Sequence, residues 1–109
     1  MNTINMLTDA PVMFAAVYVS PIVVTDSQEA FRELTRCAER YALEFTGVLP
    51  GEIPGVQEAR QFFRAIGIDP TKRRLSSEAL LLRSIKRKGI DPVNNLVDVG
   101  NWCSLEFLL

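Results

Sequence analysis

The tetrapeptide Gly-Ile-Asp-Pro occurs twice in this chain, at residues 67–70 and again at residues 89–92. A glycine directly after a helix ends it by taking the left-handed conformation, and a proline shortly after the glycine prevents the helix from continuing. The two copies therefore restrict this part of the chain to short helices, predicted over residues 56–66 and 77–88. The residues expected to face the core are Val56, Ala59, Phe62, Phe63 and Ile66 on the first of these helices and Ala79, Leu80, Leu82 and Ile85 on the second.

Residues 12–24 are predicted to form a buried strand. Val17, Val19 and residues 22–24 favour extended structure, and Ser20-Pro21 is expected to bend the strand or place it at a sheet edge. The run lacks the basic leader of a signal peptide, and it is too short to cross a bilayer, which takes about 20 residues. We therefore expect no membrane segment.

An amphipathic helix is predicted from Gln28 to about Phe45, because its apolar residues recur every three or four positions. Residues 25–27 (Thr-Asp-Ser) supply the N-cap chemistry that would begin this helix, which we interpret as scaffold. The glycine- and proline-rich residues 47–55 are predicted to be a connector. Both prolines of this segment, Pro50 and Pro54, lack the backbone N–H group that a phosphate-binding loop would need there.

Composition excludes several kinds of catalytic chemistry. The chain has 109 residues, the length of one domain, with no histidine and only two cysteines. Nucleophilic sites built on histidine are therefore impossible within this chain, and two cysteines are too few for a four-cysteine zinc site. We expect neither a metal nor a cofactor. Two cysteines suit free thiols in a reducing compartment, which predicts a cytoplasmic protein.

Basic residues are concentrated in the second half of the chain. Residues 1–60 carry four basic and eight acidic side chains, whereas residues 61–109 carry eight basic and five acidic ones. If the helix over residues 77–88 is regular, Arg83, Lys86 and Arg87 share one face, and such mutually repelling cations gain from an external anion such as a phosphate backbone. A solvated helix surface is the alternative explanation. The candidate RNA-binding residues are Arg74, Arg83, Lys86, Arg87 and Lys88.

Asp98 and Asn101 lie three positions apart within an apolar run near the end of the chain. If the run is helical they share a face, and a buried carboxylate without a partner would be costly. Asp98 either braces a neighbouring backbone or lines a small polar pocket with Asn101, and the residues alone favour bracing. Gly100 weakens the helical pattern between them. The apolar ending Phe107-Leu108-Leu109 is expected to be exposed unless further protein covers it.

Three groups of residues carry a resemblance to a known family. The first is Arg60 with Phe63 and the Gly-x-Asp-Pro cap, the second is the Ser-x-Glu-Ala-Leu helix of residues 76–83, and the third is residues 94–99 (Asn-Asn-Leu-Val-Asp-Val) followed by Asn101. With these motifs, residues 59–109 resemble the editing domain of the beta subunit of phenylalanyl-tRNA synthetase, and they are more similar still to the free-standing bacterial proteins built on that domain.

The resemblance implies a single α+β domain over residues 1–109, with a sheet layer flanked by three or four helices. In the synthetase this domain hydrolyses the ester of wrongly attached tyrosine, and the free-standing relatives are expected to bind tRNA or aminoacyl-tRNA. The resemblance makes Asp98, Gly100 and Asn101 candidates for the substrate pocket, with Gly100 standing where the synthetase has threonine. It also places Arg83 near the tRNA end.

The synthetase motif continues into a Gln-Pro-x-His-x-Phe-Asp element that lies beyond Leu109. We therefore expect the N-terminal half of an editing-type domain, truncated, that binds tRNA or aminoacyl-tRNA and is not catalytic alone. One alternative is a non-catalytic interaction module that a partner chain or a second copy completes. Another is a helical DNA-binding module, which is disfavoured because the predicted strand and the Asp98–Asn101 run have no place in it.

Overall fold

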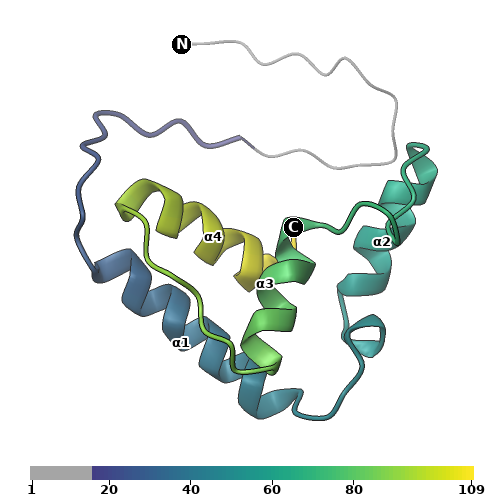
Figure 1. Cartoon of the computed structure of the whole chain (residues 1–109). Helices are drawn as coiled ribbons and strands as arrows, with labels where there is room; N and C mark the ends of the chain where they lie inside the picture. The colour runs from purple at the N-terminus through teal and green to yellow at the C-terminus, as the bar shows by residue number, and fades with distance from the viewer. Residues whose placement is uncertain (1–15) are drawn as a thin grey trace.

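The computed structural model describes residues 16–109, and within them the chain forms four α-helices and one short 3-10 helix (Figure 1). Helices α1, α3 and α4 pack against one another, while α2 packs on η1, which in turn contacts α3. None of these helices is long and apolar enough to cross a bilayer. Their bounds are α1 Glu29–Glu44, η1 Pro50–Glu52, α2 Val56–Ala65, α3 Ser76–Ile85 and α4 Asn95–Phe107.

The predicted α+β fold with a sheet layer is wrong, because residues 16–109 contain no strand. The part of the predicted strand that is described, residues 16–24, has no regular secondary structure and is exposed throughout; residues 12–15 lie outside the described range. A strand is stabilised by the neighbouring strand with which it pairs. The described residues that follow form helices and connectors, so nothing among them supplies that neighbour.

The exposed segment is nevertheless attached to the helical part of the chain. Asn95, the first residue of α4, accepts a hydrogen bond from the Thr25 N–H at its Oδ1 (2.8 Å) and donates from Nδ2 to the Val23 carbonyl (2.8 Å). The Asn95 N–H also donates to the Thr25 carbonyl (2.9 Å). Thr25 is therefore engaged with α4 rather than with the start of α1, whose N-cap Gln28 makes no side-chain capping bond.

The core lies where α1, α3 and α4 meet. Leu34, Leu81 and Leu105, one from each helix, are fully buried at its centre. The predicted position of α1 is confirmed, because its apolar residues pack on this core as their spacing requires. The buried core also includes the loop residue Ile53 and Val56 of α2. The side chains of α1 that line the core are Phe31, Leu34, Cys37, Ala38 and Tyr41, followed by Phe45 just after the helix.

The prediction of the residues that α3 turns to the core is confirmed only in part. Leu80 and Ile85 pack against the core as predicted, beside the fully buried Leu81, whereas Ala79 and Leu82 are not among the residues packed there. The buried face also includes polar side chains at positions 77, 78 and 84. An assignment based on apolar residues alone misses such a face, because polar side chains such as Glu78 and Ser84 can be buried when they have hydrogen-bond partners.

The apolar end of the chain is only partly exposed. Leu108 is left-handed (φ 55°) and turns its side chain into the core, where it is 6% exposed. Gly55, with φ 96°, leaves room for it, since a Cβ there would stand 3.0 Å from Leu108 Cδ1. Phe107 and Leu109 on either side are exposed. The expectation of a wholly exposed ending is therefore wrong for Leu108.

Candidate nucleic-acid interface

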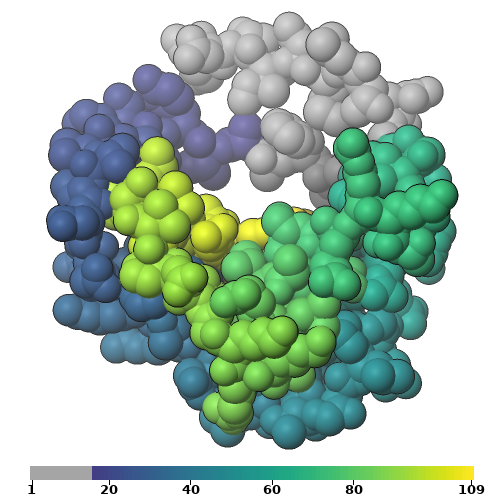
Figure 2. Space-filling view, viewed as in Figure 1, coloured from purple at the N-terminus to yellow at the C-terminus, as the bar shows by residue number. Residues whose placement is uncertain are grey.

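Four basic side chains surround a hollow beside α3, which we call the basic groove. Arg74, Arg83, Lys86 and Lys88 line it, together with Ala79 and Leu82, and its volume is about 290 Å³. Four of the lining positions, 79, 82, 83 and 86, recur at three- and four-residue steps, so they form one face of α3. In the space-filling view, α3 and the residues after it lie at the molecular surface between α1 and α2 (Figure 2).

The opposite face of α3 holds the helix in this orientation. Glu78, Leu81 and Ser84 recur at three-residue steps and are all buried. The Ser84 hydroxyl donates to the Leu80 carbonyl within the helix (2.8 Å), which satisfies it without water. Because these residues point inward, the helix geometry directs Ala79, Arg83 and their neighbours outward.

Glu78 is the one acidic residue among residues 72–88, and it is turned away from the basic groove. Its carboxylate accepts two hydrogen bonds from the Arg60 guanidinium of α2, one from Nε at 3.2 Å and one from Nη2. The hydrogen bond to Glu78 raises the pKa of Arg60, so the guanidinium keeps its charge. Glu78 is thus paired with Arg60 and does not neutralise the groove.

The cations of the groove have no acidic partners in the described part of the chain. The ion pairs within residues 16–109 join Arg36 to Glu33, Arg40 to Glu106, Arg60 to Glu78 and Arg87 to Glu39. None of them involves a residue of the basic groove. The groove therefore concentrates positive charge that an external anion would stabilise.

Arg83 is fixed in place by the loop after α3. Its Nε donates to the Gly89 carbonyl at 2.9 Å, and the Lys88 N–H donates to the Arg83 carbonyl at 2.9 Å. These bonds close the end of the helix and bring Lys88 back to the groove. An arginine held through Nε keeps its terminal N–H groups, which suit a phosphate oxygen.

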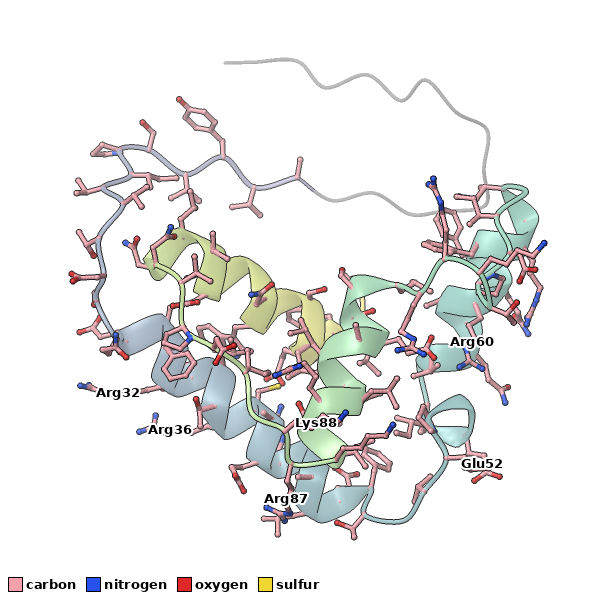
Figure 3. The ribbon with its side chains drawn as sticks, in the orientation of Figure 1. Arg32, Arg36, Glu52, Arg60, Arg87 and Lys88 are labelled. Carbon is pink, nitrogen blue, oxygen red and sulfur yellow. The ribbon has the colours of Figure 1, made fainter. Side chains whose placement is uncertain are left out.

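Arg87 does not join the basic groove, so the prediction that it shares a face with Arg83 and Lys86 is wrong. Helix α3 ends at Ile85, and Arg87 takes the left-handed conformation (φ 53°). Its side chain lies beside α1, apart from Lys88 (Figure 3), with Nη1 3.5 Å from the Glu39 carboxylate. The helix was predicted to continue to Lys88, and only that continuation would have placed Arg87 on the common face.

The predicted substrate-pocket residues lie on α4 and do not line the basic groove. Asp98 is 1% exposed, and its Oδ1 accepts a hydrogen bond from the Val93 N–H at 3.1 Å. The bracing role favoured for Asp98 is therefore confirmed. Asn101 is half-buried one turn later, and Gly100 is exposed, with open space where a Cβ would stand.

A larger hollow between α1 and α4, which we call the α1–α4 cleft, was not anticipated from the sequence. Its volume is about 540 Å³, and its walls include Trp102 and Val99 of α4 and Arg32 and Arg36 of α1. The sequence does place the two arginines one helical turn apart, and Val99 and Trp102 likewise. It does not show that the two pairs meet, since they lie in different helices far apart in the chain.

The buried cysteine is not a reactive centre. Cys37 donates through Sγ to Glu106 Oε2 at 3.1 Å, and Glu106 is also paired with Arg40. Burial, together with the neighbouring carboxylate, raises the pKa of Cys37 to about 12. A thiol with so high a pKa is protonated at neutral pH and is a poor nucleophile. No group of three or more potential metal ligands occurs within residues 16–109.

No family model matches the chain, and neither a curated protein nor a solved structure shows a significant match. The resemblance to the editing domain therefore depends on the three motif groups in residues 59–109. Of these motif residues, the structure gives Arg60, Glu78, Asn94, Asn95 and Asp98 defined hydrogen-bonding roles within the fold.

Proposed function

We propose that this chain binds RNA, and tRNA in particular, through the basic groove. The observation that carries the proposal is the gathering of Arg74, Arg83, Lys86 and Lys88 around one hollow, without acidic partners in the described residues. Phosphate contacts supply most of the sequence-independent affinity of proteins for nucleic acids. The motif resemblance of residues 59–109 supports tRNA as the RNA concerned.

The proposed role of the groove is binding rather than catalysis. Its lining consists of basic and aliphatic side chains, with no carboxylate, thiol or hydroxyl among them. Hydrolysis of an aminoacyl ester needs a group that positions or activates water, and such a group must lie within hydrogen-bond reach of the reacting atoms. We therefore expect affinity for tRNA, and no hydrolysis of mischarged tRNA by these 109 residues alone.

Binding of labelled tRNA, measured by fluorescence anisotropy across a range of salt concentrations, tests the proposal. Four phosphate contacts predict that the logarithm of affinity falls with the logarithm of salt concentration at a slope of roughly −3 to −4. The triple variant Arg74→Gln, Arg83→Gln, Lys86→Gln should weaken binding and reduce that slope by about 3, since each lost phosphate contact removes about 1.

A matched control removes the same charge elsewhere. Arg64, Lys72 and Arg73 are also exposed cations, but they do not line the basic groove. The triple variant with glutamine at these three positions should change the affinity much less than the groove variant does. Equal losses in the two variants would show that net charge, not the groove, governs binding. Absence of tRNA binding at low salt would overturn the proposal outright.

A second candidate function, a protein-interaction module, is favoured by the exposed apolar side chains of the described region. Val17, Val19 and Val23 of the N-terminal segment are exposed, as are Leu96 and Phe107 of α4. Clusters of exposed apolar side chains mark interaction surfaces when they are contiguous. Analytical ultracentrifugation tests self-association. A native chain that sediments as a monomer at high concentration, with the same mass as the Phe107→Ser variant, would refute it.

A further inference from the structure

The walls of the α1–α4 cleft combine an aromatic ring with two arginines. Trp102 packs against the core on one side and lines the cleft on the other, so its ring is held in place but only half-buried. A ring already held by the core loses little further freedom when a flat ligand stacks on it. The volume of about 540 Å³ lies in the usual range of small-ligand sites, about 300–1,000 Å³.

The charges around the cleft nearly balance. Glu29 and Glu33 line it together with Arg32 and Arg36, and Glu33 pairs with Arg36. Arg32 forms no ion pair within residues 16–109. The interior therefore suits an uncharged ring better than a phosphate, while Arg32 offers a single cation at the rim.

Arg32 and Arg36 form a ridge between two hollows. They also line a second hollow on α1, of about 490 Å³, together with the aromatic ring of Phe31. Figure 3 shows both arginine side chains extending outward from α1. Cations that follow a backbone, with aromatic rings beside them, are the arrangement by which proteins bind single-stranded nucleic acid, because the bases stack while the phosphates meet the cations.

From this geometry we infer that the α1–α4 cleft binds an unpaired nucleobase of RNA, stacked on Trp102, with the adjacent phosphate on Arg32. The inference rests on the proposed function and extends it, since it assigns a site for a base where the basic groove provides one for phosphates. A stacking site needs an unpaired base, as in the single-stranded ends and loops of folded RNA.

Trp102 is the only tryptophan of the chain, so its intrinsic fluorescence reports on the cleft directly. A single-stranded 12-nucleotide oligo(A) should quench this fluorescence on binding. The same length of fully paired RNA duplex should not, because its bases are unavailable for stacking. Adenosine monophosphate distinguishes a base within RNA from a free nucleotide. We expect it to quench only at concentrations far above those of the oligonucleotide.

Two variants, with binding of labelled oligo(A) followed by anisotropy, separate the cleft from the rest of the surface. Trp102→Leu should weaken binding about 5- to 140-fold, the range that corresponds to loss of one base–aromatic stack. Arg32→Ala, an exposed change that leaves the tryptophan in place, should weaken binding and reduce the quench at a given oligonucleotide concentration. Arg64→Ala, an exposed arginine on α2, is the matched control and should do neither.

Each failure has its own meaning. If tRNA binds through the basic groove but oligo(A) leaves Trp102 fluorescence unchanged, the cleft inference is overturned and the proposed function stands. If adenosine monophosphate quenches as well as oligo(A) does, the ligand is a free nucleotide and the assignment to RNA is wrong. If no RNA binds at low salt, both proposals fall.

Discussion

Arg60→Ala removes one partner from the ion pair that joins α2 to α3. In the native chain the Glu78 carboxylate is 7% exposed and receives two hydrogen bonds from the Arg60 guanidinium, which is 32% exposed. The same guanidinium fills the space beside Gly51, since a Cβ there would stand 3.0 Å from Arg60 Nη1. The substitution therefore leaves a buried carboxylate without its cation and a gap between η1 and α2.

Loss of one partner from a buried pair costs about 3–5 kcal/mol. Because a third of the Arg60 side chain is reached by water, we expect the lower end, about 3 kcal/mol, out of a total stability of roughly 5–15 kcal/mol. At about 4–8 °C per kcal/mol for a domain near this size, the melting temperature should fall by about 12 °C or more.

Urea denaturation followed by far-ultraviolet circular dichroism measures this effect, and a double variant tests its cause. Arg60→Met with Glu78→Leu removes both charges and fills similar volumes, so its stability should lie within about 1 kcal/mol of the native value. If Arg60→Ala alone costs less than about 0.5 kcal/mol, the carboxylate is not effectively buried and the reasoning about the pair is refuted.

Three further outcomes can be checked by simple measurements. Asp98→Ala should cost about 1–3 kcal/mol in urea denaturation, because it removes the buried side chain that accepts the Val93 N–H hydrogen bond, whereas Asp98→Asn retains an acceptor and should cost less. Iodoacetamide at pH 9 should alkylate the exposed Cys103 and spare Cys37 in mass spectra. The Cys37 pKa of about 12 keeps that thiol protonated there, and equal labelling would contradict its burial. Leu81→Ala, at a fully buried site, should cost about 2–5 kcal/mol.

The helices were predictable because their signals are local. Gly67 takes a positive φ just after α2 ends, as the first Gly-Ile-Asp-Pro copy predicts. The second copy was wrong as a stop signal, because α3 ends at Ile85, before Gly89, and Arg87 is the left-handed residue that follows it. The predicted helices over residues 28–45 and 56–66 agree with α1 and α2 to within a residue or so. The prediction of a sheet was wrong for the opposite reason, because a sheet depends on non-local pairing. Val17 and its neighbours favour a strand locally, but a strand also requires a paired segment, which is not a local property.

The candidate site, like the fold, was predictable only where its signals are local. Arg74, Arg83, Lys86 and Lys88 were selected as a charge cluster, and the structure brings them to one groove. Arg87 was wrongly placed on the groove face because the helix was predicted to include it. Helix α3 ends two residues before Arg87, which takes the left-handed conformation and points elsewhere. The α1–α4 cleft escaped prediction altogether, since its two walls come from helices whose approach is set by the packing of the core rather than by any motif.

The hydrogen bonds that join Asn95 to Val23 and Thr25 have a mechanical consequence. One side chain and its own peptide group join α4 to the main chain at Val23 and Thr25, across about seventy positions of sequence. Tension applied to the exposed residues 16–24 would thus act on α4 before it acted on α1. Optical-tweezer traces of chains pulled from that end should lose an early, low-force event when Asn95 is replaced by alanine.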